Sequence, residues 1–95
     1  GLQTVYPPEN ETLHARILQS GAVLSQFWPD FSGVVGGANF LARNRTMAHL
    51  SQAMVVVEAS FRSGARSAAV YAQKVGRPVL LLRSLVSSEA WAKEM

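Results

Sequence analysis

Residues 53–82 read as a strand, a helix and a second strand, and this pattern constrains the possible folds more than any other stretch. The first strand, AMVVVEA, is a β-branched apolar run without alternation, which is typical of a parallel strand covered on both faces. Residues 65–75 carry alanines at helical spacing, Gly76 ends that helix, and the apolar run PVLLL follows. The stretch has the length of one βαβ unit, whose crossover is right-handed in nearly all proteins.

The segment before this unit also combines a helical pattern with an apolar run. Asn10 is a candidate helix cap, residues 11–20 keep the i,i+4 apolar spacing of a helix, and Gly21 ends it. The run AVLSQF at 22–27 predicts a short strand. The glycine-rich stretch 28–38 predicts a loop that is long enough to be functional.

Two further helices flank the βαβ unit. Residues 40–51 have helical character and lead into the first strand. The tail SLVSSEAWAKEM, residues 84–95, predicts one final helix with Ser87 or Ser88 as its cap. The predicted fold class is therefore α/β, a Rossmann-like parallel sheet of three or four strands with flanking helices.

The length of 95 residues bounds the chain to one domain. Three or four parallel strands leave sheet edges and faces that need cover. We therefore expect residues 1–95 to be a single, partial Rossmann-like domain, half of a doubly wound one. No leader is visible, and no apolar run approaches the roughly 18 residues of a membrane span, so we expect no membrane partner. The absence of cysteine agrees with a cytoplasmic protein.

Positive charge gathers in the second part of the sequence. Between residues 31 and 88 the only acid is Glu58, whereas five of the six acids lie outside this window. The basic residues in the same window are Arg43, Arg45, Arg62, Arg66, Lys74, Arg77 and Arg83. The planar fork of arginine matches phosphate oxygens, so this distribution indicates an anionic partner such as nucleic acid. A solubilising surface is an equally simple interpretation.

Three segments converge where a ligand would bind in an open α/β sheet, beyond the carboxyl ends of the strands. Glu58 closes the first strand, and the turn RSGAR after it opens a helix. Ser63-Gly64 lies at the start of that helix, where free N–H groups and the dipole favour an anion. A plain turn with Ser63 as helix cap explains the same residues. Phe40 precedes a helix and can offer a ring for base stacking, or belong to the core.

Arg43 and Arg45 differ by about 200° around a helix and cannot share one face. One of them is predicted to turn inward and to pair with Glu58, the only nearby acid in the sequence. The other arginine would remain available to phosphate.

Other chemistries find little support. His14 and His49 have no carboxylate at ligand spacing, so no metal site is expected. No serine has evident triad partners, and GVVGGA matches neither the dinucleotide nor the phosphate-loop motif. Arg83 follows the second strand where a ribose-binding acid would be expected. These patterns argue against a metal site, a serine nucleophile and a nicotinamide cofactor.

The blocks VYPPEN, GAVLSQF, NFLARNRTMAHLS and the βαβ unit, in this order, resemble the DprA/Smf family of DNA-processing proteins. The resemblance covers residues 5–82. Its most specific part is Phe40-x-x-Arg43-Asn44-Arg45 before Leu50-Ser51, followed by Glu58 and Ser63-Gly64.

The resemblance implies an extended Rossmann-like fold, of which this chain is the second half. It implies a binding protein for single-stranded DNA, with no cofactor and no enzyme activity, that loads a RecA-type recombinase during natural transformation and forms homodimers. The implied site is the Phe40–Arg45 segment and the Ser63-Gly64 turn. With the flanking arginines, the candidate DNA-binding residues are Phe40, Arg43, Asn44, Arg45, Arg62, Ser63, Gly64 and Arg66.

The sequence also departs from the family pattern. Leu41 replaces the usual proline, Ala65-Arg66 follows Ser63-Gly64 in place of Ser/Thr-Leu, and the family's first half is absent. These departures imply weakened or repurposed DNA binding. The alternative functions are a nucleotide or nucleotide-derivative binding protein or hydrolase, and a half-domain that serves only dimerisation or docking.

Overall fold

The computed structural model describes residues 2–28 and 37–95. The chain divides into two compact units, one within residues 1–34 and the other within residues 35–95. No helix in the described ranges is long and apolar enough to cross a membrane. The prediction of one domain over residues 1–95 stays a prediction.

The first unit is built around one helix. The short 3-10 helix η1 (Pro8–Asn10) leads into α1 (Glu11–Ser20), whose bounds confirm the helix predicted at 11–20. Asn10 occupies the cap position without a side-chain hydrogen bond, and the Gly21 N–H donates to the Ile17 carbonyl at the other end, 2.8 Å away. Nothing in α1 is buried among the described residues.

The strand predicted at 22–27 does not form in the structure, and this prediction was wrong. The Phe27 N–H donates to Ser25 Oγ over 3.1 Å, a local bond of the kind that competes with a sheet ladder. The loop predicted at 28–38 lies mostly outside the described residues, and its last two positions belong to the next helix.

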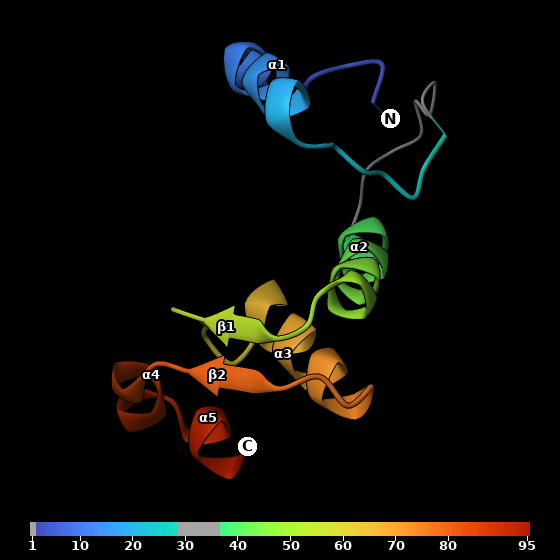
Figure 1. Cartoon of the computed structure of the whole chain (residues 1–95). Helices are drawn as coiled ribbons and strands as arrows, with labels where there is room; N and C mark the ends of the chain where they lie inside the picture. Colours follow the sequence, from blue (N-terminus) through green and yellow to red (C-terminus); the bar gives the residue numbers. More distant parts are fainter. Residues whose placement is uncertain (1, 29–36) are drawn as a thin grey trace. The chain divides into compact units, whose positions relative to one another are not determined.

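The second unit contains the predicted βαβ unit. In chain order its elements are α2 (Gly37–Leu50), β1 (Met54–Val56), α3 (Gly64–Lys74), β2 (Val79–Leu81), α4 (Arg83–Ser88) and α5 (Ala90–Glu94). The strands β1 and β2 pair in parallel with Met54 opposite Val79, and α3 is the crossover (Figure 1). This confirms the α/β, Rossmann-like class. The part of the chain that is described contains two strands, rather than the three or four predicted.

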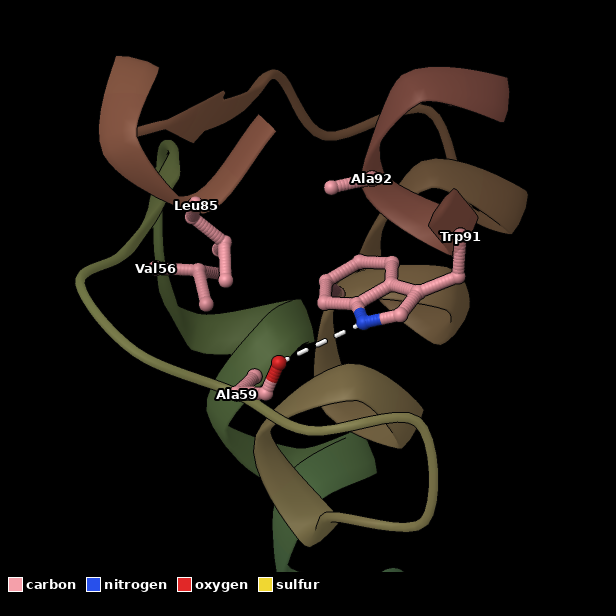
Figure 2. Close-up of a cluster of buried hydrophobic side chains, with 6 residues drawn as sticks. Val56, Ala59, Leu85, Trp91 and Ala92 are labelled. Carbon is pink, nitrogen blue, oxygen red and sulfur yellow. Dashed lines mark hydrogen bonds between the residues drawn. The ribbon is translucent and has the colours of Figure 1, made fainter. Parts of the chain in front are cut away.

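The core lies on one face of this sheet. Val56 of β1 packs with Leu85 of α4 and with Trp91 of α5 (Figure 2). The Trp91 indole N–H donates to the buried carbonyl of Ala59 over 3.3 Å, so the only polar atom of that ring is satisfied. Ala69 of α3 completes the cluster, and its small side chain lets the helix approach the strands closely.

The opposite face of the sheet is open in the described residues. Val55 is 62% exposed and Leu80, its register partner, is 54% exposed. The prediction that β1 is covered on both faces was therefore wrong, because α3, α4 and α5 all contribute to the core on the face of Val56.

The C-terminal tail forms two short helices instead of the single one predicted. Glu89 is extended, with φ −120° and ψ 120°, and separates α4 from α5. Ser87 and Ser88 do not cap a helix, because their hydroxyls donate back to the carbonyls of Arg83 and Leu85. The break lets Trp91 reach the core.

Arg77 fixes the end of α2. Its Nε donates to the Ala48 carbonyl over 3.2 Å and its Nη2 to the His49 carbonyl over 2.9 Å. A guanidinium at this position satisfies free carbonyls and complements the negative end of the helix dipole. Gly76, with a φ of 83°, makes the turn that brings Arg77 back to α2.

Candidate functional site

An open pocket of about 1080 Å³ lies alongside β1, between α2 and the start of α3. We call it the groove. It includes the carboxyl end of β1, where the sequence predicted a ligand site. The groove is lined by Gly37, Phe40, Leu41, Arg43, Asn44, Met47, Met54, Val55, Val56, Val57, Glu58, Arg62, Gly64, Ala65, Ser67 and Ala68.

Phe40 and Arg43 form a paired ring and cation on the wall of the groove. They are three residues apart and therefore neighbours on the surface of α2. The guanidinium carbon of Arg43 lies 5.5 Å from the centroid of the Phe40 ring. The Phe40 side chain is 49% exposed, and Arg43 is exposed as well, so both groups are accessible from the groove.

Asn44 is the buried residue of this segment, with 7% of its surface exposed. Its Oδ1 accepts from Arg43 Nη2 over 3.3 Å, and its Nδ2 donates to the Gly64 carbonyl over 3.4 Å. The amide thus connects α2 with the first residue of α3 and holds the Arg43 guanidinium. Asn44 was predicted to bind DNA, which stays a prediction, and in the structure its amide positions Arg43.

Both arginines of the segment are exposed, so the prediction that one turns inward was wrong. The inward position belongs to Asn44, which lies between them. Glu58 is exposed too, and in the described part of the chain its predicted pairing with Arg43 or Arg45 does not form. Burying a neutral amide costs less than burying a guanidinium, which explains the choice.

Arg45 lies on the other side of α2, as the offset of about 200° predicts. Its guanidinium carbon is 5.5 Å from the centroid of the Tyr71 ring of α3. The Tyr71 hydroxyl is 2.9 Å from His49 Nε2, and the two rings meet edge to face. A smaller pocket of about 340 Å³, which we call the hollow, lies here and is lined by Leu41, Asn44, Arg45, Arg66, Ser67, Val70, Tyr71 and Lys74.

Tyr71 was not predicted as a functional residue, and Lys74 was not connected with Arg45. A signal was present, because Ser67, Tyr71 and Lys74 follow the four-then-three spacing of one helix face. That spacing marks a face of α3 but does not show that α2 packs beside it.

In the turn before α3, one residue caps the helix and its two neighbours line the groove. Ser63 Oγ accepts from the Arg66 N–H over 3.1 Å and donates to the Ser60 carbonyl over 2.8 Å. This is the helix cap of the simpler interpretation, and Ser63 does not line the groove. Arg62 and Gly64 do line it, on either side of the cap.

Arg66 packs against aromatic rings. Its guanidinium carbon lies 4.3 Å from the Phe61 ring centroid and 5.9 Å from that of Trp91, and Nη1 donates to the Phe61 carbonyl. Its Nε is buried and has no hydrogen-bond partner among the described residues. These contacts hold the Arg66 guanidinium beside the Phe61 and Trp91 rings. Arg66 does not line the groove.

The structure thus groups the eight predicted DNA-binding residues into two neighbouring places. Phe40, Arg43, Arg62 and Gly64 line the groove, and Arg45 and Arg66 line the hollow. Asn44 lines both, and Ser63 lines neither. No cluster of three or more potential metal ligands occurs among the residues that the structure describes.

Comparisons with known proteins agree on one family. A family model described as "DNA recombination-mediator protein A" matches residues 1–93. The chain is 44% identical over 82 residues to Protein Smf of Synechocystis, covering 86% of this chain and 20% of that protein. It is 40% identical over 83 residues to Protein Smf of Escherichia coli, covering 86% of this chain and 22% of that protein. The chain therefore spans about a fifth of the length of these relatives. No solved structure matches it.

Proposed function

The chain belongs to the DNA recombination-mediator protein A family, and from this premise we propose that it binds single-stranded DNA in the groove. In this proposal the chain is a binding protein and not an enzyme. The strand lies along α2 and the start of α3, with its bases toward Phe40 and its phosphates toward Arg43 and Arg62.

The observation that carries the proposal is the accessible pair of Phe40 and Arg43. A ring that is 49% exposed offers a face on which any base can stack, and the guanidinium 5.5 Å from its centroid meets the adjacent phosphate. Aromatic platforms combined with positive charge bind single strands with little sequence preference. Asn44 supports the pair, because its hydrogen bond from Arg43 holds the guanidinium in place.

The start of α3 offers a second phosphate contact in the same groove. Gly64 is exposed, and a Cβ added there would meet only Asn44 Nδ2, at 4.0 Å. A backbone without a side chain lets a phosphate approach the positive end of the α3 dipole. Arg62, one residue before the Ser63 cap, adds a full charge on the same wall.

We also propose the wider role that the family description supports, DNA recombination mediation. Under this proposal the protein delivers bound single strands to a RecA-type recombinase during natural transformation, in the cytoplasm and as a homodimer. Groove binding is the step on which these further roles depend.

Anisotropy of a labelled oligo-dT, titrated with the chain at two salt concentrations, tests the proposal. Affinity is expected to fall as salt rises, because phosphate contacts release counterions. Arg43→Gln is expected to weaken binding, whereas Arg83→Gln, which removes an exposed charge outside both pockets, is expected to leave it unchanged. Equal affinity of both variants, or no binding by the unmodified chain, would contradict the proposal.

The nucleotide-binding alternative gives a different result in the same assay. A mononucleotide that raises the melting temperature, while oligo-dT does not, would show that the groove holds a single nucleotide instead of a strand.

A further inference from the structure

The groove and the hollow are neighbouring pockets on the packed helices α2 and α3. Leu41, Asn44 and Ser67 line both pockets, so the two spaces meet at these residues. The helices pack side by side, and the common residues come from both of them. Leu41 and Ser67 are exposed, so the shortest surface route from the groove to the hollow passes over these two side chains.

The hollow has the composition of an anion site. Arg45 comes from α2 and Lys74 from α3, and both side chains are exposed. None of the described residues that line it is an aspartate or a glutamate. Within the described lining, the exposed charges of Arg45 and Lys74 therefore have no acidic partner.

The hollow also contains a fixed aromatic ring. Tyr71 is half-buried, its hydroxyl is bonded to His49 Nε2 over 2.9 Å, and its ring lies 5.5 Å from the Arg45 guanidinium carbon. The bond to His49 limits rotation of the ring, and the ring attracts the cation. Arg45 is thus held in place at the hollow, which lowers the cost of ordering it when an anion binds.

We propose that a single strand bound in the groove continues into the hollow, where Arg45 and Lys74 contact its phosphodiester backbone. This inference rests on the proposed function of the groove and adds a second subsite with its own residues. The site is then bipartite: a base-stacking part at Phe40, and a part that contacts phosphates beside Tyr71. A strand too short to span both parts engages only the groove.

Two lengths of oligo-dT separate the two parts, for example about 4 and about 16 nucleotides, the ends of the usual range for single-strand sites. We expect the double variant Arg45→Gln/Lys74→Gln to lose about tenfold or more in affinity for the long strand, since it loses two charge-assisted contacts. Its affinity for the short strand is expected to equal that of the unmodified chain. The slope of log affinity against log salt for the long strand is expected to become shallower by about 1.4, at about 0.7 for each phosphate contact.

The matched control is Arg83→Gln/Lys93→Gln, which removes an exposed arginine and an exposed lysine outside both pockets. It is expected to bind both strands normally. The charge-conserving variant Arg45→Lys/Lys74→Arg is expected to keep the salt slope, and melting curves check that each variant is folded.

The outcomes separate this inference from the proposed function. If the Gln variant binds the long strand normally, or loses equally for both lengths, the hollow is not a second subsite, although the groove still binds DNA. If the unmodified chain binds neither strand, the proposed function fails and the inference fails with it.

Discussion

Each side of α2 presents an arginine beside an aromatic ring, but the two rings come from different helices. On the groove side Arg43 lies 5.5 Å from the Phe40 ring, and on the hollow side Arg45 lies 5.5 Å from the Tyr71 ring. Phe40 belongs to the same helix as its arginine, whereas Tyr71 comes from α3 and is anchored by His49. The first pair depends on local helix geometry, and the second depends on the packing of two helices.

This difference concerns function as well as construction. The Phe40 ring is 49% exposed and can take a base on its free face. Tyr71 is half-buried and contacts both His49 and Arg45. Its ring therefore orients the Arg45 guanidinium and leaves little free face on which a base could stack. Asn44 lies between the two arginines and contacts both pockets.

Substitution of Asn44 should have the largest effect, because it removes the connection on which both sides depend. Asn44→Ala loses two side-chain hydrogen bonds, one to the Gly64 carbonyl and one from Arg43, at about 0.5–1.5 kcal/mol of stability each. Oligo-dT affinity should fall as well, since Arg43 loses its support. Urea denaturation measures the first effect and anisotropy the second.

The control for Asn44→Ala is Leu50→Ala on the same helix, which truncates a side chain that is 66% exposed. It should change stability by less than about 0.5 kcal/mol. Similar losses in the two variants would show that the Asn44 bonds do not join α2 to α3 in solution.

Phe40→Ala should have the next largest effect and should act on the groove side alone. Loss of one stacked base costs about 1–3 kcal/mol, equivalent to about 5- to 150-fold in affinity. The loss should be the same for short and long oligo-dT. Tyr6→Ala removes another exposed ring, 88% accessible and outside both pockets, and should bind normally. If both variants weaken binding equally, stacking on Phe40 is not the source of affinity.

The fold shows what the sequence could and could not predict. The apolar runs at 53–59 and 78–82 predicted two parallel strands correctly, because a β-branched stretch bounded by turns has few alternatives. The run at 22–27 has the same apolar character but forms no strand, since a strand needs a partner and periodicity cannot show one. The break at Glu89 was missed for a similar reason. It depends on the packing of Trp91 in the core, which is a tertiary contact that local sequence patterns do not reveal.

In the candidate site, too, the features set by local helix geometry were predictable and those set by tertiary packing were not. The offset of Arg43 and Arg45 follows from helix geometry and was predictable, as was the cap formed by Ser63. The inward residue was predicted wrongly, because the amide of Asn44, which lies between the two arginines, costs less to bury than a guanidinium. The sequence could not show that Phe61 and Trp91 lie beside Arg66, whose contact with phosphate stays a prediction.

Tyr71→Leu should have a smaller effect and should act on the hollow side alone. It removes the ring beside Arg45, and an exposed cation–π contact contributes about 0.5–1 kcal/mol. Affinity for long oligo-dT should fall by about 2- to 5-fold, and affinity for short oligo-dT should not change. Tyr71→Phe keeps the ring and should bind nearly normally. If Tyr71→Phe is as weak as Tyr71→Leu, the hydroxyl bonded to His49 matters more than the ring does.

The most direct comparison of the two sides changes one charge at a time and measures the salt slope. Arg43→Gln and Arg45→Gln each remove one phosphate contact, so each should make the salt slope for long oligo-dT shallower by about 0.7. With short oligo-dT, only Arg43→Gln should change the slope, since a short strand in the groove does not reach Arg45. Equal changes at both lengths would mean that the arginines contact the same few nucleotides. The opposite sides of α2 would then act as one site. It would make no difference to DNA binding that Phe40 lies on the same helix as its arginine whereas Tyr71 lies on α3.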